Sequence, residues 1–201
     1  VMYGLVSLWG GLMGLGLSLI IRLELGSGGA WLGDEYLYNV IVSAHAIMMV
    51  FFLVMPMFLG GFGNWLMPVM LGMDDMALPR LNNLSFLMVP VALMLFSVSM
   101  FIKGGGAGWT LYPPLVLGDY SASSSVDVMI LSLHVVGLSS LLGSVNLLVT
   151  AAVGAKGVGS VVLMLMMVGS WVIMGALGVL ELPFGGAALI MLMWDGKGRT
   201  S

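Results

Sequence analysis

The sequence has no cysteine and very little charge, since only 7% of its 201 residues are Asp, Glu, Lys or Arg. The absence of cysteine excludes disulfides, Cys-ligated zinc, iron–sulfur clusters and thiol catalysis on this chain. With 60% hydrophobic residues and a mean hydropathy of +1.14, the composition predicts an integral membrane protein. The net charge of −3 is too small to favour nucleic acid or an acidic ligand as a partner.

Long apolar runs divide the chain into about five segments that can each cross a bilayer, which needs about 20 apolar residues. We therefore expect an all-α membrane protein, a single domain over residues 1–201, with spans at about 2–24, 38–71, 84–102, 126–153 and 158–193. The second run is longer than a bilayer requires, so it should tilt or unwind near its glycines, which begin at Gly60. Gly10 and Gly14 form a small-xxx-small pair that favours close helix packing.

The chain contains only two histidines, His45 and His134, and both lie inside apolar runs. From its position alone, His45 either serves a metal, a cofactor or a proton path, or packs between helices with a hydrogen bond to a backbone carbonyl. For His134 the interhelical hydrogen bond is the favoured interpretation. A haem held by both histidines is the rival, but two-helix cytochromes usually carry a second histidine pair, which this sequence lacks.

Arg22 lies near the end of the first span, and a rise of 1.5 Å per residue puts it at a depth comparable with that of His45. A guanidinium beside a buried imidazole suits an anionic or carbonyl-bearing cofactor. The alternative is that Arg22 extends to the membrane interface.

Uncharged polar residues collect toward the opposite end of the predicted bundle, around one acid, Asp75. Ser139, Gly143, Asn146 and Thr150 are spaced as one face of a helix, with Ser140 beside them, and in lipid such a stripe must face protein or water. The sequence predicts an acidic mouth at Asp75 that leads to a file of neutral hydrogen-bonding side chains, an arrangement suited to proton uptake. The residues of this file are Asn64, Asn82, Ser85, Ser139, Ser140 and Asn146. The alternative is a set of interhelical hydrogen bonds, each worth about 0.6 kcal/mol.

Several stretches resemble the first catalytic subunit of the haem–copper cytochrome c oxidases: NVIVSAHAIMMVFFLVMPMFLGGFGNWLMPVMLGMDDMALPRLNNLSF, GWTLYPPL, SVDVMILSLHVVGLSSLLGSVN and ELPFGGAALIMLMWD. The resemblance is collinear from about Tyr3 to the end of the sequence. The short loops fit the mitochondrial form better than the bacterial form, so the resemblance implies the mitochondrial inner membrane.

The resemblance implies a haem A site at one end of the bundle. His45 matches one of two axial ligands to the low-spin haem A iron, and Arg22 matches the arginine that hydrogen-bonds the haem formyl group. Trp109 matches a tryptophan near that group, and Tyr38 a tyrosine bonded to a haem propionate. Such neighbours tune haem potential.

The resemblance also assigns ions and protons to particular residues. Glu24 and Gly29 match positions around a sodium or calcium site, where a carboxylate and a backbone carbonyl suit a hard cation. Asp75 and the neutral file match the entrance and lining of the family's D proton pathway, whereas His134 matches a histidine that is not a metal ligand.

The resemblance covers five of the family's twelve spans, so we expect a second chain to supply the remaining helices, with the oxygen-binding haem, the copper and the other haem A ligand. Subunits II and III and the electron donor cytochrome c are the further partners implied, and oxidase activity is expected only in that assembly. Glu181, an acid within the fifth span, is expected to pair with a basic residue on the second chain. A haem-free proton channel or transporter fragment, and a bis-histidine membrane cytochrome, are the alternatives.

Overall fold

The computed structural model describes residues 1–201 apart from 27, 103–104, 118–123, 155–163 and 199–201. The described residues form helices and turns and no strand. In chain order the helices are α1 (Met2–Gly26), α2 (Glu35–Ile47), η1 (Met48–Val54), η2 (Pro56–Gly63), α3 (Asn64–Leu71), α4 (Pro79–Phe101), α5 (Ser125–Gly154), η3 (Met164–Val168) and α7 (Gly169–Gly198).

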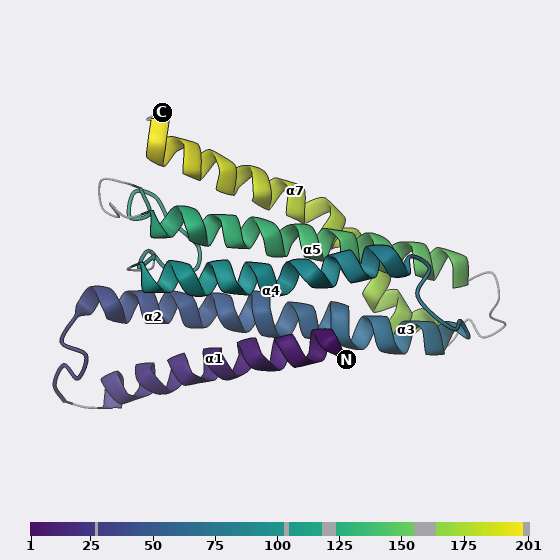
Figure 1. The fold of residues 1–201 in the computed structure, drawn as a ribbon, viewed down its shortest axis with the longest axis horizontal. Helices are drawn as coiled ribbons and strands as arrows, with labels where there is room; N and C mark the ends of the chain where they lie inside the picture. The colour runs from purple at the N-terminus through teal and green to yellow at the C-terminus, as the bar shows by residue number, and fades with distance from the viewer. Residues whose placement is uncertain (27, 103–104, 118–123, 155–163, 199–201) are drawn as a thin grey trace.

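Five helical stretches among the described residues are long and apolar enough to cross a membrane: Met2–Gly26, Glu35–Leu71, Pro79–Phe101, Ser125–Gly154 and Met166–Lys197. They run back and forth along the long axis of the molecule (Figure 1). The expected all-α membrane fold is therefore confirmed. The predicted beginning of the fifth span, 158–163, lies outside the described residues.

The second membrane-length stretch is one helical rod built from α2, η1, η2 and α3. It begins at Glu35, because the Asp34 carboxylate accepts hydrogen bonds from the amides of Tyr36 and Leu37. It ends at Gly72, whose φ of 67° is the left-handed conformation that glycine adopts readily. The sequence predicted a tilt or an unwinding near Gly60, and the chain stays helical there. The backbone instead widens into the π-helical segments η1 and η2, which keep their hydrogen bonds inside the helix, as lipid requires.

Glycines on α1 let this helix approach the rod closely. A Cβ built on Gly10 would lie 3.1 Å from the backbone oxygen of Phe52, and one on Gly14 would lie 2.7 Å from Sδ of Met49. Larger side chains at these positions would push the two helices apart. The predicted small-xxx-small pair is thus the face of α1 that contacts η1.

Two clusters of buried apolar side chains hold the remaining helices together. The larger cluster joins the rod to α4 and α5 and includes Phe52 and Phe96, whose ring centroids are 5.6 Å apart. The smaller cluster joins α3, α5 and the beginning of α7, and it includes Met67 and Trp171. α7 lies against α5 and is the least buried of the five membrane-length stretches (Figure 1).

Candidate functional site

His45 lies on α2, half-buried, with its ring turned toward α1. Its Nδ1 is 2.9 Å from the carbonyl oxygen of Gly14, so Nδ1 carries the proton and donates to that carbonyl. The lone pair then resides on Nε2, which makes no hydrogen bond within the described part of the chain. A histidine that ligates a metal typically has one ring nitrogen tied to a carbonyl and the other free, as here.

Arg22 does not lie at the depth of His45. It is eight residues beyond Gly14 on the same helix, which corresponds to about 12 Å along the axis, and it is exposed. The expectation of a comparable depth was wrong because α2 begins at Glu35 rather than at Tyr38, which places His45 almost one turn deeper.

The other predicted cofactor residues lie toward the same end of the bundle. Tyr38 is half-buried on α2, seven residues before His45. Trp109 is 52% exposed, in the loop that follows α4. The neighbouring amide of Gly108 donates to the Ser43 hydroxyl at 3.0 Å, which ties this loop to α2 two residues from His45.

Glu24 organises the loop between α1 and α2. Its Oε2 accepts hydrogen bonds from the amides of Trp31 at 3.1 Å and Leu32 at 2.8 Å. Gly29 lies exposed in the same loop. The described residues contain no group of three or more His, Cys, Asp or Glu side chains placed to hold a metal ion. The sodium or calcium site stays a prediction.

At the opposite end of the rod, Asp75 lies exposed at a wide hollow of about 710 Å³. Asn64 and Asn82 line the hollow as well, and Nδ2 of Asn64 donates to Oδ1 of Asn82 at 2.7 Å. The structure therefore brings the predicted acidic mouth, Asp75, together with two residues of the predicted file.

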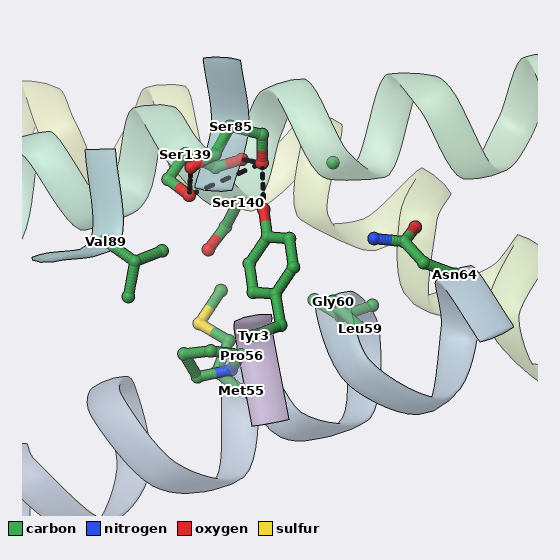
Figure 2. A pocket seen from close by; sticks show the side chains of 11 residues that line it. Tyr3, Met55, Pro56, Leu59, Gly60, Asn64, Ser85, Val89, Ser139 and Ser140 are labelled. Carbon is green, nitrogen blue, oxygen red and sulfur yellow. Dashed lines mark hydrogen bonds between the residues drawn. The ribbon is translucent and has the colours of Figure 1, made fainter. Parts of the chain in front are cut away.

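A smaller cavity of about 20 Å³ lies beyond the hollow, with room for about one water molecule. Its polar lining is Tyr3, Asn64, Ser85, Ser139 and Ser140 (Figure 2). Tyr3 and Asn64 line the hollow too, so the two spaces share a wall. Predicted file residues from α3, α4 and α5 meet at this cavity.

Hydroxyl groups run in series at the wall of the small cavity (Figure 2). The Tyr3 hydroxyl is 2.6 Å from Oγ of Ser85, and that Oγ donates to the carbonyl oxygen of Ser139 at 2.8 Å. The Ser139 hydroxyl in turn donates to the carbonyl oxygen of Ser85 at 2.6 Å. Tyr3 was not predictable from the sequence, because one tyrosine in the first turn of an apolar span carries no signal until the crossing of α1 and α4 is known.

Asn146 is fully buried but lines neither space. Its Oδ1 accepts a hydrogen bond from the amide of Leu78 at 3.0 Å, and its Nδ2 has no partner within the described part of the chain. The structure thus separates Asn146 from the other predicted file residues and places it beside the turn that follows Asp75.

His134 is an interhelical histidine, as the sequence analysis favoured. Its Nδ1 is 2.9 Å from the carbonyl oxygen of Ile130, and its Nε2 is 3.2 Å from that of Gly186 on α7. It faces α7 while His45 faces α1, which removes support from the bis-histidine alternative. Glu181 is exposed on α7, and its pairing with another chain stays a prediction.

The five membrane-length stretches of the described residues define a multi-span membrane protein. A histidine with a free ring nitrogen lies toward one end of its second stretch, and a polar hollow with an exposed acid lies at the other end. The family described as "Cytochrome C and Quinol oxidase polypeptide I" matches residues 1–199. The chain belongs to this family, as the resemblance implied.

Relatives named "Cytochrome c oxidase subunit 1" support the same assignment. The chain is 54% identical to the protein of Pecten maximus over 151 residues, which is 74% of this chain and 32% of that protein. It is 43% identical to the protein of Mytilus edulis, over 96% of this chain and 35% of that protein. It is 41% identical to the protein of Eremothecium gossypii, over 100% of this chain and 38% of that protein. The chain thus spans about a third of the length of these relatives.

Proposed function

We propose that this chain forms part of the catalytic subunit I of a cytochrome c oxidase in the mitochondrial inner membrane. In this role it binds low-spin haem A through His45 and takes up protons at Asp75. Family membership and the names of the relatives support this proposal. Oxygen reduction belongs to the assembly with a chain carrying the remaining helices, subunits II and III, and cytochrome c as electron donor.

The residues around His45 fit a haem. Nε2 of His45 would ligate the iron, and the bond from Nδ1 to Gly14 orients the ring and makes Nε2 a stronger donor. Arg22, Tyr38 and Trp109 would hydrogen-bond or contact the periphery of the group. Haem A, when bound, supplies one-electron redox chemistry, while the oxygen-binding haem and the copper are expected on the remaining part of the subunit.

The observation that carries the proton-uptake proposal is the shared wall between the open hollow at Asp75 and the water-sized cavity. The exposed carboxylate of Asp75 collects protons from water. Tyr3 and Ser85 carry hydroxyls that both donate and accept, so they pass a proton without holding a charge in the membrane.

Replacing His45 with alanine tests the haem site. We expect the assembled complex to lose the absorbance of low-spin haem A, because the ligating nitrogen is gone. His134→Ala is the matched control and should retain that absorbance. Retained absorbance in His45→Ala would disprove the ligand assignment. A complex without haem would favour the proton channel, and one with haem B only would favour the bis-histidine cytochrome.

Replacing Asp75 with asparagine tests proton uptake. We expect slower uptake, followed with a pH-indicator dye during turnover, with unchanged haem content. Asp74→Asn is the matched control, because Asp74 is an exposed neighbour that does not line the hollow. Equal uptake rates in the two variants would contradict the role of Asp75.

A further inference from the structure

The turn between α3 and α4, residues 72–78, carries Asp75 and is fixed by side chains of α5. α4 begins at Pro79, and the amides of the three residues before it are bonded by side chains. The amide of Met76 donates to the Asp75 carboxylate at 2.7 Å. The next two amides donate to α5: that of Ala77 to the Thr150 hydroxyl at 3.1 Å, and that of Leu78 to Oδ1 of Asn146 at 3.0 Å.

The α5 residues that contact the turn share one helical face, because they are spaced four apart. They are Asn146, Thr150 and Gly154. A Cβ built on Gly154 would lie 2.7 Å from Cδ1 of Leu71 and 2.9 Å from Sδ of Met73, so only glycine admits this close approach. The turn therefore lies along the last two turns of α5 and contacts it at both of its ends.

Thr150 and Asn146 are placed to hold the backbone rather than to pass protons. Both are fully buried and line neither the hollow nor the small cavity. The Thr150 hydroxyl donates its proton to the carbonyl oxygen of Asn146 at 2.7 Å while it accepts from the amide of Ala77.

The same contacts set where Asp75 lies relative to the rest of the mouth. The carbonyl oxygen of Leu78 accepts from the amide of Asn82 at 3.0 Å, and the Asn82 side chain accepts from Asn64. Leu78 is thereby bonded to α5 through its amide and to the mouth through its carbonyl. A shift of the turn would move the Asp75 carboxylate away from the two asparagines.

We infer that Thr150 and Asn146 are positioning residues for proton uptake, which hold the Asp75 turn against α5 at the entrance of the polar file. This inference rests on the proposed proton-uptake function. It assigns Asn146 a role different from the lining role that the sequence suggested.

The test compares Thr150→Val, which removes the hydroxyl and keeps the volume, with Thr150→Ser, which keeps the hydroxyl, both in the assembled complex. Thr110→Val is the matched control, because it makes the same chemical change in the loop at the other end of α4. Two quantities are measured in each: amide hydrogen exchange of the peptide that contains residues 74–78, and the rate of proton uptake.

We expect the Ala77 amide to exchange about fivefold faster in Thr150→Val, the factor that corresponds to losing one neutral hydrogen bond. Proton uptake should slow in the same variant, and haem content should not change. Thr150→Ser should restore both quantities, and Thr110→Val should alter neither. If Thr150→Val fails to assemble, Thr150→Ala removes the same hydroxyl without added bulk and gives the same comparison.

Slower uptake with unchanged exchange in Thr150→Val would overturn the positioning role in favour of a direct proton relay, and unchanged uptake would overturn it outright. Failure of the underlying function has a separate signature, which is normal uptake in Asp75→Asn. Slow uptake in Asp75→Asn combined with normal uptake in Thr150→Val would reject the positioning role alone.

Discussion

Replacing Gly60 with alanine tests whether the position of the Tyr3 ring controls proton uptake through the polar file. A methyl group at Gly60 would overlap the Tyr3 ring, with Cε1 only 2.5 Å away. The ring has little freedom to yield, because its hydroxyl bonds Ser85 and its edge packs on Phe86 with a centroid distance of 5.3 Å. Forcing extra volume into such a packed site costs about 1–3 kcal/mol.

A displacement cost of about 2 kcal/mol would leave Tyr3 in its present position for only about 3% of the time, because 1.36 kcal/mol corresponds to a tenfold change. If the hydroxyl of Tyr3 carries the proton past Gly60, uptake should fall about 30-fold by the same conversion. Stopped-flow measurement with a pH-indicator dye on the assembled complex gives this rate.

Gly61→Ala is the matched control for this experiment. A Cβ at Gly61 would lie 3.3 Å from Sδ of Met57, the flexible end of a side chain that can move aside, and 4.0 Å from the backbone oxygen of Pro56, an ordinary van der Waals contact. Equal uptake rates in Gly60→Ala and Gly61→Ala would refute the reasoning, since both lie in η2 and differ chiefly in their contact with Tyr3.

Three further predictions concern the end of the bundle near His45. Gly14→Leu should push α1 from the rod and weaken the hydrogen bond from Nδ1 of His45. Because the imidazole then becomes less basic, a redox titration should show a higher midpoint potential for the bound haem. An unchanged potential would count against the role of that hydrogen bond. Asp34→Ala should destabilise the start of α2 by about 1 kcal/mol and speed amide exchange in its first turn, whereas unchanged exchange would exclude capping. Lys197→Ala, which removes the exposed ion pair with Asp127, should change thermal stability by less than about 1 kcal/mol, and a larger loss would indicate that the pair is essential to α7 packing.

The helices of this fold were predictable because lipid imposes one rule on every span. A run of apolar residues must satisfy its own backbone, so length and hydropathy alone locate the five stretches. The widening of the rod into η1 and η2 was not predictable, since α- and π-helical turns satisfy the same backbone groups and the sequence pattern does not separate them.

The candidate site was predictable only in part. The polar stripe on α5 was predictable from the helical spacing of its residues. In the structure this stripe faces α4 and the turn that carries Asp75. The contribution of Tyr3 depends on where α1 crosses the other helices, and the separate place of Asn146 depends on the backbone amides of a turn. Neither is encoded in the spacing of side chains along one helix.

The π-helical stretch of the rod has a consequence for how the chain tolerates changes in length. In an α-helix each residue turns the following side chains by about 100°, so deleting one residue misdirects everything beyond it. A π-helical turn holds more residues than an α-helical turn, so η1 and η2 place more residues between His45 and Asn64 than an α-helix of the same number of turns would. A single deletion there can be absorbed by reversion to α geometry, with both ends of the rod still facing their partners. α4 and α5 contain no π-helical segment, so the same deletion there would reorient every side chain beyond it.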